Sequence, residues 1–353
     1  MVWVRNLRIR DLRNIAGVAV DLDPGLNVFS GRNAQGKTSL LEAVGLLARG
    51  RSFRTEDPLS MIRHGAAGLL ALGETVDTAE AAHLEVELSG GERRLRVDGR
   101  DVAPRDYHGR LEVVVYSTER LRIVGSMRDR RQLLDRSAGA LWPSYRADHR
   151  AFERVLAQRN AVLVRRGRDL GAWTDRFVET GARLRQRRAT YAARLSGALR
   201  EGFRPSGESY EVRVASPAGE PEAQDALRRE LEALHLRELA AARSLAGPHR
   251  DPVALLVDGK DAADGASSGQ ARSLLLALAL ATLRIYREET GRAAVALLDD
   301  LDSELDAERA GALCAEVVEG GQALVTSAHP TWADSLRPLG RVFCVEGGGV
   351  RGA

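Results

Sequence analysis

Eight consecutive residues near the start of the chain carry its strongest chemical pattern. Residues 31–38 read GRNAQGKT, which fits the spacing G-x-x-x-x-G-K-[ST] of a loop whose backbone N–H groups surround phosphates. Lys37 and Lys260 are the only lysines among the 52 Lys and Arg residues. The compact lysine ammonium fits a tight anion site that a planar arginine head would overfill. The pattern therefore predicts a nucleotide-phosphate site. Its candidate residues are Gly31, Arg32, Asn33, Ala34, Gln35, Gly36, Lys37, Thr38 and Ser39.

The flanks of this loop indicate the elements that position it. Residues 26–31, LNVFSG, are typical of a short buried strand, and residues 37–48 repeat apolar side chains at helical spacing. Strand, glycine loop and helix N-terminus in this order make an anion site, because N–H groups and the positive helix end face the phosphates. The alternative is a chance match in a glycine-rich chain, and these flanks argue against it.

A pair of carboxylates follows another apolar run. Residues 294–306 read AVALLDDLDSELD, so a buried strand would end at Asp299. There Asp299 could hold a Mg²⁺-bound water, while Asp300 could act as the general base on an attacking water. Paired aspartates after a strand also occur in turns and helix caps. The phosphate loop upstream favours the catalytic interpretation.

A Ser-x-Gly-Gln turn opens the most apolar helix expected in the chain. It comprises residues 267–270, and Ser267, Gly269 and Gln270 are its candidate phosphate contacts. One nucleotide does not need two such helix N-termini from one subunit. We therefore expect the second one to face the γ-phosphate of a nucleotide held by another copy, in a head-to-tail dimer with two ATP molecules. The alternative is that the serine only caps its helix.

Two further features lie downstream of the carboxylates. Residues 303–306, SELD, occupy the position of a loop that would link the two sites of such a dimer. Residues 323–330 read as a strand that ends at His329, which could sense the γ-phosphate or could be a structural histidine.

Composition sets the broad class. A chain of 353 residues with 44% hydrophobic and 29% charged side chains is typical of a soluble globular protein. Cys314 and Cys344 show neither metal-ligand spacing nor a disulfide framework. The N-terminus lacks the apolar core of a signal peptide, and the longest apolar run, residues 273–283, is too short to span a bilayer. We expect a cytoplasmic protein without a membrane partner.

Positive charge is concentrated in the middle of the chain. Residues 120–200 contain 20 arginines and 7 acidic residues, a local charge of +13, whereas the whole chain carries +3. The remainder therefore carries −10. Such segregation indicates a polyanionic partner. Solvated faces of arginine-rich helices are the alternative interpretation.

Periodicity divides the chain into three segments. Residues 1–125 read as β-rich, the first half of an ATPase lobe. Residues 126–240 read as an arginine-rich helical lobe, apart from a loop at 202–224 that precedes a short helix. Residues 241–353 return to an α/β pattern, the second half of the ATPase lobe.

Taken together, these motifs resemble a known family. The chain is similar to the ABC-type ATPase heads related to SMC proteins and, within them, to the RecF family of bacterial repair proteins. The resemblance runs nearly end to end and rests on segments in RecF order. These are LRIRDLRNI, GRNAQGKTSLLEA, GRSFRT, GSMRDRRQLLDR, AFERVLAQRNAVL, GPHRDP, SSGQARSL and LLDDLDSELD.

The resemblance implies a fold and a function. The fold would be an α/β P-loop NTPase of ABC type with an inserted helical lobe and no long coiled coil. The protein would dimerise with ATP and bind single-stranded and gapped duplex DNA. It would also have weak, DNA-stimulated ATPase activity. With RecR-like and RecO-like mediators it would help to load recombinase onto gaps, in recombination, replication, repair and the SOS response.

The resemblance also implies roles for individual residues. Lys37 would contact the β- and γ-phosphates, Thr38 and Asp299 would hold Mg²⁺, and Asp300 would activate the lytic water. Arg13, in LRNI, would lie near the phosphates. One departure falls in the phosphate loop, where Ala34 replaces a glycine that is common in the family.

A different class shares the phosphate loop and a Ser-Gly-Gln turn, namely the ATP-binding subunit of a membrane transporter. The short signature, the arginine-rich insertion and the absence of a clear coupling segment argue against it. The leading interpretation is an ATP-gated DNA clamp in which slow hydrolysis acts as a timer.

Overall fold

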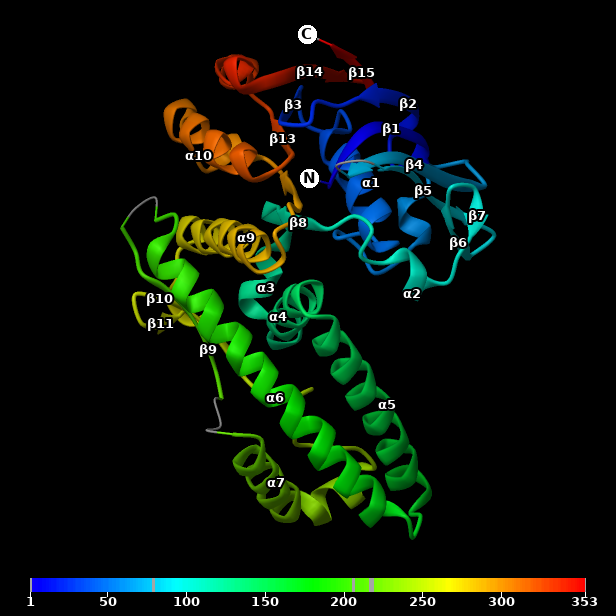
Figure 1. Cartoon of the computed structure of the whole chain (residues 1–353), viewed down its shortest axis with the longest axis vertical. Helices are drawn as coiled ribbons and strands as arrows, with labels where there is room; N and C mark the ends of the chain where they lie inside the picture. Colours follow the sequence, from blue (N-terminus) through cyan, green and yellow to red (C-terminus); the bar gives the residue numbers. More distant parts are fainter. Residues whose placement is uncertain (1, 78–79, 205–206, 216–218, 353) are drawn as a thin grey trace. The chain divides into compact units, whose positions relative to one another are not determined.

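The computed structural model describes residues 2–77, 80–204, 207–215 and 219–352. The chain divides into two compact units. The first joins Met1–Arg120 to Thr282–Ala353, and the second is Leu121–Ala281. Figure 1 labels the helices and strands of both units.

One sheet of the first unit is antiparallel throughout, in the order β2-β1-β4-β5-β6-β7. Its strands alternate buried and exposed residues because only one face is covered. Gly90 and Gly91 form the turn between β5 and β6, both with positive φ. The strands are β1 Val2–Leu12, β2 Ile15–Asp21, β4 Gly68–Asp77, β5 Glu80–Ser89, β6 Glu92–Val97 and β7 Arg100–Asp101.

The other sheet of the first unit has the order β15-β14-β3-β13-β12-β8, and only β15 runs antiparallel to its neighbour. Strands β3, β12 and β13 are buried along their whole length, as expected for a sheet covered on both faces. The strands are β3 Leu26–Ser30, β8 Val113–Tyr116, β12 Val295–Leu298, β13 Ala323–Ser327, β14 Gly340–Glu346 and β15 Gly349–Gly352.

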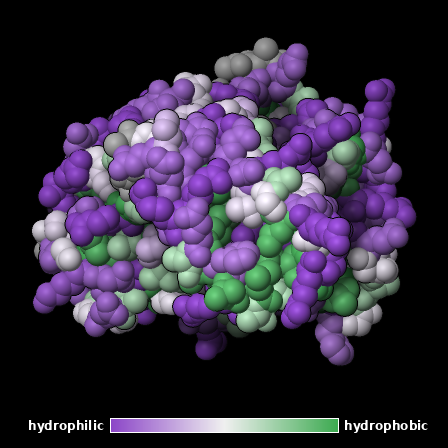
Figure 2. All heavy atoms as spheres, turned by 90° about the horizontal axis from the view of Figure 1, so that it is seen from below, coloured by the Kyte–Doolittle hydropathy of each residue, from purple (hydrophilic) through white to green (hydrophobic). Residues whose placement is uncertain are grey.

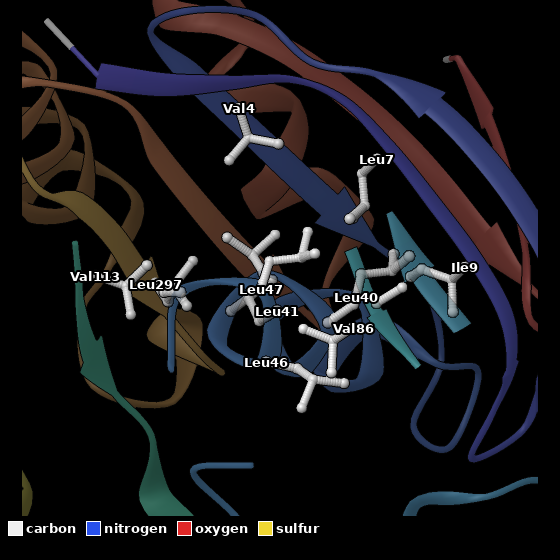
Figure 3. Close-up of a cluster of buried hydrophobic side chains, with 14 of the residues drawn as sticks. Val4, Leu7, Ile9, Leu40, Leu41, Leu46, Leu47, Val86, Val113 and Leu297 are labelled. Carbon is white, nitrogen blue, oxygen red and sulfur yellow. The ribbon is translucent and has the colours of Figure 1, made fainter. Parts of the chain in front are cut away.

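Helix α1 (Lys37–Arg49) links the two sheets through the apolar core. Figure 3 shows leucines of α1 among side chains from β1, β5, β8 and β12. Of the 13 residues in α1, 11 are buried, so the helix that follows the phosphate loop is held on several sides. The other helices and 3₁₀ turns of this unit are η1 Leu59–Met61, α2 Pro104–Tyr107, η3 Leu301–Ser303, α10 Ala307–Gly320, α11 Pro330–Ser335 and η4 Arg337–Leu339. The turn η2 Thr118–Leu121 runs across the boundary between the units.

The second unit is mainly helical. Its two longest helices, α5 (Pro143–Arg165) and α6 (Leu170–Glu201), pack along each other, and α6 buries an apolar stripe that includes Phe177 and Tyr191. Helix α9 (Ser268–Thr290) begins in this unit and ends in the first. The remaining elements are α3 Arg122–Gly125, α4 Met127–Leu141, β9 Tyr210–Val214, α7 Glu220–Ala241, β10 Val253–Val257, β11 Lys260–Asp261 and α8 Ala262–Gly265.

Two details differ from the sequence prediction. The expected loop at 202–224 was wrong in part, because Tyr210–Val214 forms strand β9 and α7 begins at Glu220; residues 205–206 and 216–218 lie outside the described residues. The helical unit also continues past 240 to Ala281, because β9 pairs with β10 in a three-stranded sheet of its own.

Polar side chains cover most of the face that Figure 2 shows. Apolar side chains gather in smaller areas of the same face. None of the described helices is both long enough and apolar enough to cross a bilayer.

Candidate nucleotide-binding site

The phosphate loop leaves β3 and leads directly into α1, as the sequence predicts. Gly36 precedes the helix with a φ of 109°, a conformation that favours glycine. A Cβ on Gly31 would lie 2.2 Å from the backbone oxygen of Val345, so the close approach of β14 also requires glycine there. The Lys37 ammonium is almost fully buried and donates to the backbone oxygens of Gly31 (2.8 Å) and Arg32 (3.1 Å). The lysine therefore bends back along the loop, within the space that the loop encloses.

The side chain of Asn14, which lies outside the phosphate-loop motif, contacts the loop. Asn14 donates to the backbone oxygen of Ala34 (2.9 Å) and accepts from the Ser39 hydroxyl (3.3 Å). The turn between β14 and β15 closes the other side, since Gly348 N donates to the backbone oxygen of Gln35 (3.0 Å). The loop is thus fastened to two distant segments of the chain.

Ala34 occupies a strained position in the loop. Its φ is 65°, in the left-handed region that costs an L-residue about 1–2 kcal/mol relative to glycine. The departure from glycine at this position therefore stores strain at the candidate site.

Asp299 lies at the end of β12, close to the phosphate loop. The carboxylate is 1% exposed and accepts three hydroxyl hydrogen bonds. The donors are Thr326 (2.8 Å), Thr38 (3.0 Å) and Ser117 (3.1 Å), which come from β13, α1 and the end of β8. Within the described residues it forms no ion pair. Burial, followed by the neighbouring charge of Asp300, raises the pKa of Asp299 to about 6.

Asp300 follows in a left-handed conformation, with a φ of 52°. Its backbone N–H donates to the Thr326 hydroxyl (2.7 Å), so one threonine fixes both aspartates. The Asp300 carboxyl is half-buried, and burial raises its pKa, although the charge of Lys37 acts in the opposite direction.

His329 lies two residues beyond the end of β13 and is exposed. Asp302, in the 3₁₀ turn after the carboxylate pair, organises this region through its Oδ2 atom. That oxygen accepts from Ser327 Oγ (2.7 Å), Ala328 N (2.7 Å) and His329 N (3.2 Å). Hydrogen bonds through Asp302 therefore connect the turn after the carboxylate pair to the backbone of the candidate sensor histidine.

Arg13 is held by an acidic side chain. Its guanidinium makes a two-pronged ion pair with the fully buried Glu42 of α1, at 2.9 and 3.0 Å, and donates to the backbone oxygen of Ser60 (2.7 Å). Glu42 also accepts from Arg54 (3.3 Å), which in turn pairs with Glu119 (2.6 Å). The neighbour of Arg13, Asn14, is the residue of that turn that contacts the phosphate loop.

The Ser-x-Gly-Gln turn belongs to the second unit. Ser267 and Gln270 cap each other, because Ser267 Oγ accepts from Gln270 N (3.2 Å) and Gln270 Oε1 accepts from Ser267 N (3.0 Å). A Cβ on the exposed Gly269 would meet only Ser267 Oγ, at 3.9 Å. The start of α9 is therefore rigid, while the space beside Gly269 is open.

The residues of the first unit fit a magnesium nucleotide. Mg²⁺ prefers one or two carboxylates together with phosphate oxygens and waters. Asp299 and the Thr38 hydroxyl provide such oxygens side by side, and a cation would neutralise a buried carboxylate that has no charged partner. No cluster of three or more His, Cys, Asp or Glu side chains able to hold a metal occurs in the described parts of the chain. A metal here would depend on phosphate oxygens as well.

Parallel strands explain why these groups meet. The phosphate loop follows β3, Asp299 follows β12, Ser117 follows β8 and Ser327 ends β13, so all lie at the carboxyl edge of one sheet. Sequence reasoning missed Asn14, Ser117, Thr326 and Asp302. A polar residue at the end of a buried strand was an available signal for Ser117 and Thr326, whereas Asn14 gave none.

The profile of the RecF/RecN/SMC N-terminal domain family matches residues 3–350. A relative from Symbiobacterium thermophilum, named DNA replication and repair protein RecF, is 37% identical over 92% of this chain and 91% of its own. A relative of the same name from Desulforudis audaxviator is 32% identical over 98% of both chains.

Solved structures agree. A structure described as the recombination mediator protein RecF with ATP in the RecFOR pathway has a TM-score of 0.89 at 26% identity, covering 100% of this chain and 99% of that one. An SMC head domain from Pyrococcus furiosus has a TM-score of 0.62 at 14% identity over 100% of this chain and 96% of its own, which shows the shared fold. The fold is thus the ABC-type ATPase head with an inserted helical unit. The chain belongs to the RecF family within the RecF/RecN/SMC group.

Proposed function

We propose that this chain is an ATP-dependent DNA-binding protein of recombinational repair. ATP induces a dimer that binds gapped or duplex DNA and helps to load recombinase onto single-stranded gaps. The observation that supports this most is the phosphate loop beside Asp299 and Asp300 in a chain whose relatives are named DNA replication and repair proteins. The transporter alternative is not carried forward, since the solved structure with a TM-score of 0.89 is a recombination mediator protein.

Residues of the first unit bind the nucleotide in this proposal. The N–H groups of the phosphate loop and the Lys37 ammonium hold the β- and γ-phosphates, while Thr38 and Asp299 hold Mg²⁺. The bound cation supplies charge neutralisation at the phosphates. Binding requires Lys37 to exchange the two loop carbonyl oxygens for phosphate oxygens, which are stronger acceptors because they are charged.

Asp300 is the proposed general base. Its backbone is fixed by Thr326, and its raised pKa makes the carboxylate a better proton acceptor than an ordinary aspartate. The side chain of aspartate is one methylene shorter than that of glutamate, so its carboxylate reaches less far toward the attacking water. Slow hydrolysis, in which the reaction times the opening of the dimer, follows from this short reach.

The second nucleotide contact comes from another copy. Ser267, Gly269 and Gln270 lie at the start of α9, and the open space beside Gly269 leaves room for a phosphate.

Mediator proteins of the RecR and RecO type are the proposed protein partners. The solved relative is described as a mediator in the RecFOR pathway, which supports this proposal.

The first test is fluorescence anisotropy of a labelled gapped duplex, titrated with and without ATP. We expect ATP-dependent binding that Lys37→Met abolishes and that Lys260→Met, at the exposed second lysine, leaves unchanged. Binding that ignores both ATP and Lys37→Met would overturn the clamp. Light scattering of the same samples measures dimerisation, which should require ATP and Lys37.

A further inference from the structure

Many arginines of the helical unit form ion pairs with carboxylates within the fold. Leu121–Ala281 contains 28 Lys and Arg residues against 20 Asp and Glu residues, a net charge of +8. Buried or nearly buried arginines pair with carboxylates far along the chain. Examples are Arg130 with Asp261 (2.6 Å), Arg159 with Glu238 (2.6 Å), Arg185 with Asp251 (2.6 Å) and Arg188 with Asp135 (2.9 Å). These pairs account for several of the RecF-like motifs, and such arginines are not available to a partner.

Some exposed arginines of this unit differ, because their guanidinium groups have no partner within the described residues. Arg200, Arg229, Arg237 and Arg243 are four of them, on α6 and on or just after α7, and the others lie along and just after α5. Arg150 and Arg154 lie one helical turn apart on α5, and Arg166 and Arg168 lie in the turn between α5 and α6. All four side chains are exposed. Within the part of the chain that the structure describes, none of the four guanidinium groups has a hydrogen-bond, ion-pair or aromatic partner. We call these four residues the α5 arginine face.

The groups around the α5 arginine face add no unpaired negative charge that would repel an anion. The exposed positions on α5 between its two ends include Ala157, Gln158 and Ala161, which are small or neutral. The two carboxylates of the stretch each face a basic group: Glu153 lies 3.7 Å from His149, and Asp169 lies 2.5 Å from Arg165. A polyanion could therefore approach α5 closely without meeting an unpaired carboxylate.

We propose that the α5 arginine face binds the phosphate backbone of duplex DNA. This inference rests on the proposed function and deepens it by naming the arginines that bind the DNA. From Arg150 to Arg165, α5 extends about 22 Å, which corresponds to roughly six base pairs. Phosphate contacts carry no sequence information, so in this proposal the face binds DNA of any sequence.

The test compares two variants of the full chain that lose the same charge. The first is Arg150→Ala, Arg154→Ala, Arg166→Gly and Arg168→Ala, with glycine at 166 because its φ is 53°. The control replaces four partly exposed arginines that do have carboxylate partners by alanine. These are Arg122, Arg183, Arg213 and Arg228.

Binding of a labelled 30-base-pair duplex is measured with ATP at several salt concentrations. Since each phosphate contact contributes about 0.9 to the slope of log K against log salt, we expect the loss of four arginines in the first variant to reduce that slope by about 3.6. Its affinity should fall at least tenfold, with ATP-dependent dimerisation unchanged. The control should keep most of the wild-type slope.

The outcomes separate the two proposals. If the wild type binds DNA with ATP and the first variant binds with the same slope, the proposal that the α5 arginine face binds DNA is wrong, while the proposed function stands. An equal loss of affinity and slope in both variants would also overturn this proposal, because net charge alone would then explain binding. If the wild type binds no duplex or gapped DNA with ATP, both proposals fail.

Discussion

The Thr38 hydroxyl oxygen lies 3.0 Å from Oδ1 of Asp299, so the first turn of α1 donates a hydrogen bond to a carboxylate at the end of β12. The two residues are 261 positions apart in the chain. This contact joins the phosphate loop to the candidate metal ligand. It also leaves a buried negative charge whose only close partners in the described residues are hydroxyls.

Burial of Asp299 predicts a specific pH dependence of stability. Because its pKa rises from 3.8 to about 6 on folding, the folded state binds more protons between these values. Without nucleotide, its contribution to the free energy of unfolding should therefore fall as the pH rises through this range, by up to about 3 kcal/mol. Asp299→Asn removes the contribution and should stabilise the free protein more at pH 8 than at pH 4.

Urea unfolding at the two pH values measures this effect. Asp225→Asn, at an exposed aspartate, serves as the matched control and should change the free energy of unfolding little at either pH. A wild type and an Asp299→Asn variant with parallel pH profiles would contradict the prediction. The same substitution should abolish the dependence of nucleotide affinity on Mg²⁺.

Asp300→Asn should separate nucleotide binding from hydrolysis. The amide cannot accept a proton, and loss of a general base typically costs roughly 10²-fold to 10⁴-fold in rate. The backbone N–H of residue 300 still bonds Thr326, so the site should keep its shape and the ATP-bound dimer should persist. Single-turnover hydrolysis and light scattering test both parts. Full hydrolysis in the variant would remove Asp300 from its proposed role.

Ala34→Gly should relieve strain in the phosphate loop. The left-handed backbone costs alanine about 1–2 kcal/mol, and glycine removes this cost. Glycine also gives the unfolded chain more conformational freedom, which offsets part of the stabilisation. A net stabilisation of up to about 1 kcal/mol is expected. Ala242, which has a φ of 52° at the end of α7, offers a matched Ala→Gly control outside the site. Both should raise the melting temperature, and only Ala34→Gly should change ATP affinity. A lower melting temperature for Ala34→Gly would contradict this account.

Asp302 should act on hydrolysis through His329. Asp302→Ala removes the acceptor of three hydrogen bonds around that histidine, and misplacement by about 1 Å can cost roughly 10²-fold in rate. We expect Asp302→Ala and His329→Ala each to slow hydrolysis, with ATP affinity nearly unchanged. If Asp302 acts by placing His329, the double variant should be no slower than either single one. Additive losses would show that Asp302 has a separate role.

Local patterns were sufficient for the elements that carry the site. The alternation and apolar runs of β3 and β12, the helical spacing of α1 and the glycines of residues 31–36 all depend on near neighbours in the chain. The strand–loop–helix order around Lys37 is therefore readable from the sequence. The inserted helical unit is readable for the same reason, since α5 and α6 each keep a continuous apolar stripe.

Only the tertiary structure decided which polar groups meet. Strand β9 was missed although its residues, YEVRV, alternate apolar and polar side chains. Five residues give a short signal, and the pairing partner, β10, lies about 40 residues later. The proximity of Arg13 to the phosphates stays a prediction, while its bidentate partner, Glu42, could not be foreseen, because the sequence marks that helix face only as apolar. Likewise, the number of arginines in the sequence does not show which of them form ion pairs within the fold and which remain exposed without a partner. A partner such as Glu238 for Arg159 lies 79 residues away, and such pairs form through long-range packing that leaves no local signal.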